Sequence, residues 1–207
     1  MSHNRRMLTR RGFAAPVSGI ALWLAGSACR PGETGDAPFD RQFIDMMVPH
    51  HEGAVEMARI AQQRAERMEL KQLAEAIIRT QSEEIRQLKA WRRAWYGSEQ
   101  TPPMSRMPMV PGMAGMAGHG AGHGGTAVDT MDMAADVERL RRAPEPFDRA
   151  FIEAMIPHHE SAIEAARAAG TRAQRQEIKD LAQTIIRDQE REIAELRQWR
   201  QSWFGSA

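Results

Sequence analysis

The sequence predicts an all-α protein, a four-helix bundle built from two repeated helical hairpins. Residues 39–98 and 147–206 align without a gap and are identical at about 34 of 60 positions, which identifies a duplication. The chain is rich in Ala, Arg, Gln and Glu, and each copy spaces its apolar residues three and four apart, as helices do. A hairpin of about 60 residues cannot bury its own apolar face, so two hairpins are expected to pack as one bundle.

The first helix of each copy carries an apolar stripe that a proline interrupts. Pro49 and Pro157 lie inside these helices, where proline removes a backbone hydrogen bond and is expected to bend the helix. A paired bend beside paired polar residues indicates a site. In the first copy the stripe consists of Phe43, Met47, Ala54, Met57 and Ala61, with Ile44, Val48, Val55 and Ala58 beside it.

A second helix is expected in each copy, from about Glu69 in the first, with an apolar seam that runs to Trp91 and Trp95. Between the copies, residues 99–146 are rich in Pro, Gly and Met and have no apolar period of their own. This segment is predicted to be a flexible connector with a short helix at 134–142. It is long enough to span the crossover between the two halves of the bundle.

The N-terminal segment has the organisation of an export signal. Residues 1–28 combine four arginines and no acid with an apolar stretch, 13–24, that is too short to span a membrane. The pair Arg10 and Arg11 is typical of a twin-arginine signal, with an ordinary secretory signal as the alternative. We therefore expect an exported protein of the periplasm or cell envelope, with residues 29–38 as a short linker before the bundle.

Cys29 is the one cysteine and lies at the expected cleavage boundary. This position is compatible with a lipoprotein anchor, and cleavage without lipidation is the alternative; a membrane association is expected only through that lipid. A single cysteine excludes an intramolecular disulfide and a Cys-ligated zinc finger. Removal of the four leader arginines leaves 24 Lys and Arg against 27 Asp and Glu, so no basic surface for nucleic acid is expected.

Polar residues interrupt the apolar seams at matching positions of the two copies. Two His-His pairs lie on or beside the buried face of the first helices, and an amide and a carboxylate lie on the seam of each second helix. Buried polar groups need partners, so imidazoles are expected to face these carboxylates. The residues are His50, His51, His158 and His159, with Gln81, Glu84, Gln189 and Glu192 expected to support them.

Methionines accompany the histidines at helical spacing. Met46, Met47 and Met57 lie near the first pair, and Met155 lies near the second, whereas Ala154 and Ala165 replace two of them in the second copy. Thioether and imidazole form a soft donor set that suits copper better than zinc or magnesium. We therefore predict a copper site at Met46, Met47, His50, His51 and Met57, and a weaker one at Met155, His158 and His159. Silver would satisfy the same donors.

The connector holds half of the 14 methionines, and its flexible methionine runs can wrap a monovalent soft cation. Because no core is expected in this segment, packing does not account for its high density of methionine. The predicted auxiliary metal ligands are Met104, Met107, Met109, Met113, Met116, His119, His123, Met131 and Met133.

The M-x-P-H-H core, the later Gln81 and Glu84, and the tryptophan-rich ending before Gly97 resemble the family catalogued as domain of unknown function 305. The second copy repeats this pattern, so the resemblance covers about 120 residues. The resemblance implies a ferritin-like four-helix bundle. The family includes envelope copper-binding proteins of the CopM kind. For this chain the resemblance implies a non-enzymatic protein that sequesters Cu(I) or Cu(II) or hands it on, with a copper exporter or oxidase as a partner.

The residues leave two alternatives open. One is a structural or interaction bundle in which the polar seam only sets helix register. The other is a ferritin-like di-metal oxidase, which needs Glu-x-x-His pairs that the seams lack. The oligomeric state stays open.

Overall fold

The computed structural model describes residues 37–108 and 130–205, so the export signal predicted at 1–28 and Cys29 lie outside the described residues. Two helical hairpins form an all-α bundle, as predicted. The elements in chain order are α1 (Phe39–Arg64), α2 (Met68–Tyr96), a 3₁₀ turn η1 (Met104–Arg106), β1 (Met107–Pro108), β2 (Thr130–Met131), α3 (Met133–Arg141), α4 (Phe147–Arg172) and α5 (Gln176–Phe204). Within the described ranges, no helix is long and apolar enough to cross a membrane.

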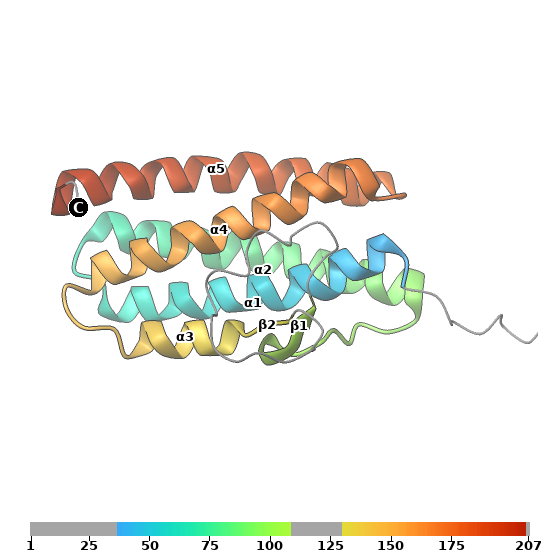
Figure 1. Ribbon diagram of the computed structural model, residues 1–207, viewed down its shortest axis with the longest axis horizontal. Coiled ribbons are helices and arrows are strands. Elements are labelled where there is room, and N and C mark those ends of the chain that lie inside the picture. The colour runs from blue at the N-terminus through green and yellow to red at the C-terminus, as the bar shows by residue number, and fades with distance from the viewer. Residues whose placement is uncertain (1–36, 109–129, 206–207) are drawn as a thin grey trace, which may run out of the picture. The chain divides into compact units, whose positions relative to one another are not determined.

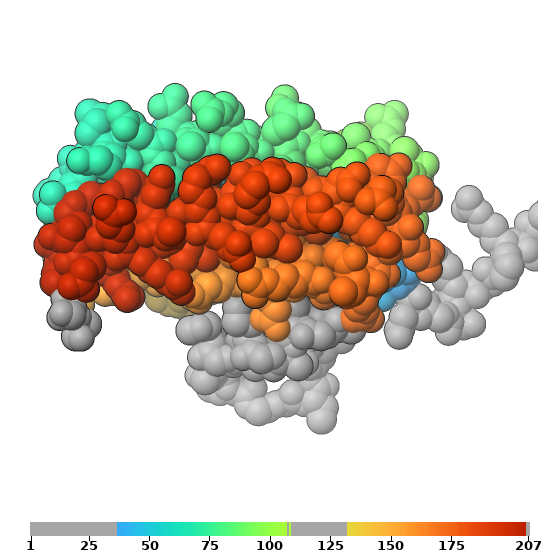
Figure 2. Space-filling model, turned by 90° about the horizontal axis from the view of Figure 1, so that it is seen from above, coloured from blue at the N-terminus to red at the C-terminus, as the bar shows by residue number. Residues whose placement is uncertain are grey.

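The two hairpins pack through their first helices. α1 packs on α2 and α4 packs on α5, while α1 and α4 run antiparallel beside each other and join the two halves (Figure 1). α2 and α5 lie side by side along one face of the bundle (Figure 2). α1 and α4 continue as helices through Pro49 and Pro157. The arrangement places the middle of α1 against the middle of α4, where the prolines and histidines are.

Both ends of the connector pack against the bundle. β1 and β2 form a two-residue antiparallel ladder, and both α3 and β1 contact α1 (Figure 1). α3 buries Met133, Val137 and Leu140, which follow each other at helical spacing along one face. The short helix predicted at 134–142 is therefore confirmed as α3, and it packs on the bundle although the connector was predicted to be flexible.

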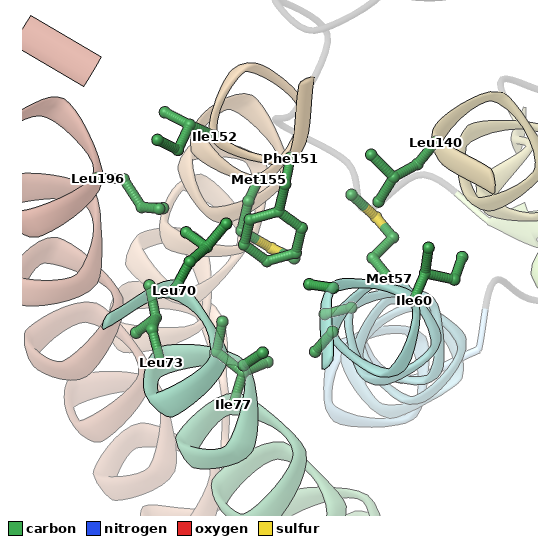
Figure 3. Packing of buried hydrophobic residues seen from close by; sticks show 14 of the residues in the cluster. Met57, Ile60, Leu70, Leu73, Ile77, Leu140, Phe151, Ile152, Met155 and Leu196 are labelled. Carbon is green, nitrogen blue, oxygen red and sulfur yellow. The ribbon is translucent and has the colours of Figure 1, made fainter. Parts of the chain in front are cut away.

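The core consists of two clusters of buried side chains. In the first, Phe151 and Met155 of α4 meet Leu70 and Ile77 of α2, and Met57 extends from α1 toward α3 (Figure 3). The second holds Met46 and Met47 of α1 with the alanines of α4. The buried histidines of α1 and α4 lie where these helices cross.

Each hairpin also caps a helix of the other. The residues that precede α2 and α5 offer no capping side chain. Instead, Asp148 accepts hydrogen bonds from the backbone N–H groups of Glu66 and Arg67, at 3.0 and 3.1 Å. Asp40 does the same for Gln174 and Arg175, at 2.9 and 3.1 Å. Two buried carboxylates thus hold the hairpins together, and each lies close to the positive end of a helix dipole.

We expect Asp148→Ala to lower the free energy of unfolding by about 2–4 kcal/mol, because it removes two charge-assisted hydrogen bonds and leaves two backbone donors without them. Urea denaturation followed by circular dichroism measures this loss. Glu83→Ala is the matched control, since Glu83 forms an exposed ion pair with Arg86, and such pairs contribute about 0–1 kcal/mol. Equal effects of the two substitutions would contradict the capping role.

Candidate metal centre

The four predicted histidines meet at the crossing of α1 and α4. The rings of His50 and His158 are in contact, with centroids 3.9 Å apart and planes inclined at 46°. The ring centroid of His51 lies 6.1 Å from that of His50, and the ring centroid of His159 lies 6.2 Å from that of His158. All four are buried. The crossing therefore brings the two sequence-distant His-His pairs into one imidazole cluster.

The outer histidine of each pair faces a carboxylate on the second helix of its own hairpin. His159 Nε2 forms a 2.7 Å hydrogen bond with Glu192 Oε2. His51 Nε2 lies 2.8 Å from Glu84 Oε2, at ion-pair distance although outside hydrogen-bond alignment. The expectation that imidazoles face Glu84 and Glu192 is therefore confirmed. Gln81 and Gln189 are buried nearby in sequence, and neither side-chain oxygen has a hydrogen-bond partner among the described residues.

The inner histidine of the first pair is held by a serine of the other repeat. Ser161 Oγ donates to the carbonyl of His158 at 2.7 Å and lies 2.7 Å from His50 Nε2. Because the hydroxyl has a single proton, it must accept from His50, which places the imidazole proton on Nε2. The Nδ1 atom of His50 then carries a lone pair.

His158 has no such partner, because Gly53 occupies the position that corresponds to Ser161. A Cβ on Gly53 would lie 3.6 Å from His158 Nε2, 3.6 Å from Met133 Sδ and 3.3 Å from Met133 Cβ. The missing serine side chain thus makes room for a methionine of α3. The pseudo-symmetry of the duplication is therefore broken at this contact.

The predicted thioethers of the helices are all buried, in two places. Met46 and Met47 pack in the cluster that contains Ala165, and Met57 and Met155 pack in the other. Met57 shares a cavity wall with Ala154, His158 and Met133. Ala154 and Ala165 of α4 stand where α1 has Met46 and Met57. These two methionines of α1 lie in the same parts of the core as the two alanines.

The connector residues divide into three groups. Met133 is buried and Met104 is half-buried against the second core cluster, so packing explains these two methionines, contrary to the prediction for the whole connector. Met107 and Met131 are paired in the β1–β2 ladder. The remaining predicted connector ligands lie outside the described residues: Met109, Met113, Met116, His119 and His123.

Several imidazole nitrogens of the cluster have no hydrogen-bond partner. His51 Nε2 faces Glu84 at ion-pair distance. Among the other histidine nitrogens of the described residues, no hydrogen-bond partner is found for the Nδ1 atom of any of the four rings or for His158 Nε2. A buried polar atom without a partner costs about 1–3 kcal/mol, so five in one place call for a ligand. A histidine whose other nitrogen is held by a carboxylate or hydroxyl is the usual arrangement of a metal ligand. Imidazole nitrogens with thioethers nearby fit a soft metal ion.

The histidines and carboxylates of the described residues do not converge on one point by themselves. Over residues 37–108 and 130–205, no group of three or more His, Cys, Asp or Glu side chains is placed to hold a metal ion. Asp45, the carboxylate five residues before His50, pairs instead with Arg92 at 2.5 Å. A metal ion bound to these nitrogens would need further ligands, and the buried methionines of the core offer sulfur for this.

Burial also sets the charge of the inner histidines. The pKa of His50 and that of His158 lie well below the usual 6.5, first because burial disfavours the imidazolium and next because other histidines lie close by. Both rings are therefore neutral at pH 7 and keep the lone pairs that a metal needs.

Sequence reasoning missed Ser161 and Gly53. Helical periodicity shows which face of a helix a residue is on, but not which residue of another helix lies opposite it. A position-by-position comparison of the two copies would have found the difference, because Gly53 and Ser161 are equivalent positions one turn after the histidines.

A family model described as domain of unknown function (DUF305) matches residues 40–200. No curated protein matches the sequence. The fold is similar to solved structures of CopM in three metal-bound forms. The Cu(I)-bound form is 37% identical with a TM-score of 0.60, over 80% of this chain and 98% of that chain. The Cu(II)-bound form is 41% identical with a TM-score of 0.60, over 80% and 97%. A form soaked with silver is 38% identical with a TM-score of 0.59, over the same shares.

Proposed function

Because the chain belongs to the DUF305 family, we propose that it is a copper-binding protein whose buried histidines and methionines hold the metal. The nitrogen ligands are drawn from His50, His51, His158 and His159. The sulfur ligands are drawn from Met46, Met47, Met57 and Met155. Silver, which shares the softness of Cu(I), is held by the same donors.

The observation that carries this proposal is the set of unpartnered Nδ1 atoms on four buried imidazoles. A purely structural histidine network would be expected to satisfy both nitrogens of each ring. Here the Nε2 atoms of three rings face a partner: that of His50 faces Ser161, that of His51 faces Glu84 and that of His159 faces Glu192. The Nδ1 atom of each of these rings then offers a lone pair. That pattern orients ligands toward a metal, which also favours the metal-binding function over the structural alternative.

The similarity to CopM supports the choice of metal. The CopM structures are in Cu(I)-bound, Cu(II)-bound and silver-bound forms. The donors of this chain support the same choice, since thioether sulfur favours soft ions such as Cu(I), and imidazole favours borderline ions over Mg²⁺. A carboxylate-rich di-metal oxidase is less well supported, because each seam contributes one histidine-bound carboxylate, Glu84 or Glu192.

The leader sequence supports a role outside the cytoplasm. We propose export of the protein to the periplasm or cell envelope, with Cys29 as the attachment point for a lipid anchor. There the protein sequesters copper or hands it on to a copper exporter or oxidase, and contributes in this way to copper tolerance. The role assigned is one of binding and transfer, not catalysis.

Metal preference is the direct test of this function. Native mass spectrometry of the full chain, titrated without oxygen, is expected to show retained Cu(I) and Ag(I) at metal concentrations where Zn(II) and Fe(II) are not retained. The reason is the sulfur in the donor set, which binds soft ions more strongly than hard ones. Retention of Fe(II) in preference to Cu(I), with oxygen uptake, would instead support the di-metal oxidase.

A further inference from the structure

A cavity lies between α3 and α4, over α1, and ends at the imidazole cluster. Its volume is about 840 Å³, and its inner wall includes Met57, Met133 and His158. Figure 3 shows Met57 extending from α1 toward Leu140 of α3, on the side of the core where this cavity lies. The cavity therefore joins residues of three helices that are far apart in the sequence.

His158 is the imidazole that this cavity reaches. Neither of its ring nitrogens has a well-aligned hydrogen bond among the described residues, although the His50 backbone lies close enough to raise the pKa of the ring slightly against the effect of burial. Only 7% of the residue is exposed. Met133 Sδ and His158 Nε2 each lie 3.6 Å from the position that a Cβ on Gly53 would take. A nitrogen and a sulfur donor thus approach the same point of the cavity wall.

The charges around the cavity do not favour a hydrated dication. Asp136, Glu138 and Glu153 line it, and each forms an ion pair with an arginine, at 2.5, 2.7 and 2.8 Å respectively. Without a net acidic field, little electrostatic energy offsets the cost of stripping water from a divalent ion. A monovalent ion of low hydration, bound by thioether sulfur, suits this surface better.

From these contacts we propose that Met133 of α3, His158 of α4 and Met57 of α1 form a composite Cu(I) or Ag(I) site at the inner wall of the α3–α4 cavity. The inference rests on the proposed copper function and assigns Met133 to the bundle site instead of to a separate connector site. It also accounts for Ala154 and Ala165, because the second repeat takes its sulfur from α1 and α3. Gly53 is the residue that admits Met133 to His158.

Methyl NMR of the full chain, labelled with ¹³C at the methionine methyl groups and titrated with Ag(I), tests this site. We expect the Met133 and Met57 signals to shift together, with Met133→Leu identifying the Met133 signal. Met133→Leu keeps the packing but removes the sulfur, and is expected to weaken Ag(I) binding at least about tenfold. Gly53→Ser is also expected to weaken Ag(I) binding, because the serine side chain pushes Met133 away and its hydroxyl forms a hydrogen bond with His158.

Met68→Leu is the matched control, since Met68 is 63% exposed and its loss is expected to leave the affinity unchanged. If the Met133 signal stays fixed at saturating Ag(I) while those of Met46, Met47, Met57 or Met155 shift, the composite site is wrong and the copper function stands. If none of these signals shifts, both are wrong. Because the assignment needs only Met133→Leu, which keeps the packing, the wild-type titration decides between these outcomes even if Gly53→Ser does not fold.

Discussion

Tight copper binding is expected to disappear when His50, His51, His158 and His159 are all replaced by glutamine. Glutamine keeps a donor for Ser161, Glu84 and Glu192 and a comparable volume, but offers no imidazole lone pair to a soft metal. We expect the affinity for Cu(I), measured by competition with a chromogenic chelator, to fall at least about 100-fold. Alanine would be a poorer choice, because it would leave the buried Glu192 carboxylate without its partner.

The matched control replaces His119 and His123 of the connector by glutamine. This variant has fewer histidines but keeps the imidazole cluster, so its highest-affinity site is expected to be unchanged. Circular dichroism checks that the fourfold variant stays helical. If that variant retains wild-type affinity, the buried histidines are structural and the metal is held elsewhere.

Stability is expected to fall steeply as the pH drops below 6.5. The lowered pKa values of His50 and His158 mean that below this pH the unfolded chain takes up protons that the folded protein does not. The free energy of unfolding therefore decreases with falling pH, by up to about 1.4 kcal/mol per pH unit for each of the two histidines. The loss continues until the pH reaches the folded-state pKa values, and the contribution is fully present above pH 6.5.

Urea denaturation between pH 8 and 5.5 measures this dependence, in a range where most carboxylates stay ionised. The variant with His50 and His158 both replaced by glutamine is expected to lose most of the slope. A stability that stays constant or rises toward pH 5.5 in the wild type would contradict the neutral, buried state of these rings.

The bundle could be predicted because the duplication shows which residues share an environment. The apolar seams gave the two helices of each hairpin, with α2 beginning at Met68 where about Glu69 was expected. The pairing of histidine with Glu84 and Glu192 also followed, because buried carboxylates and imidazoles on facing helices need each other.

What the sequence did not show was the contact across the pseudo-symmetry axis. The His50–Ser161 hydrogen bond joins residues 111 positions apart, and no local spacing encodes such a pair. Met133 was assigned to the connector because residues 99–146 as a whole are rich in Pro, Gly and Met, although Met133, Val137 and Leu140 form an apolar helical face. Recognising that face would have placed Met133 in the core.

X-ray absorption at the copper edge tests the central claim, that copper lies in the bundle with both imidazole and thioether ligands. The sample is the full chain with one equivalent of Cu(I), in a variant with Met109, Met113 and Met116 replaced by leucine and His119 and His123 by glutamine. We expect this variant to bind copper and to show both nitrogen and sulfur neighbours of the metal. Loss of binding, or a shell of sulfur alone, would contradict the claim.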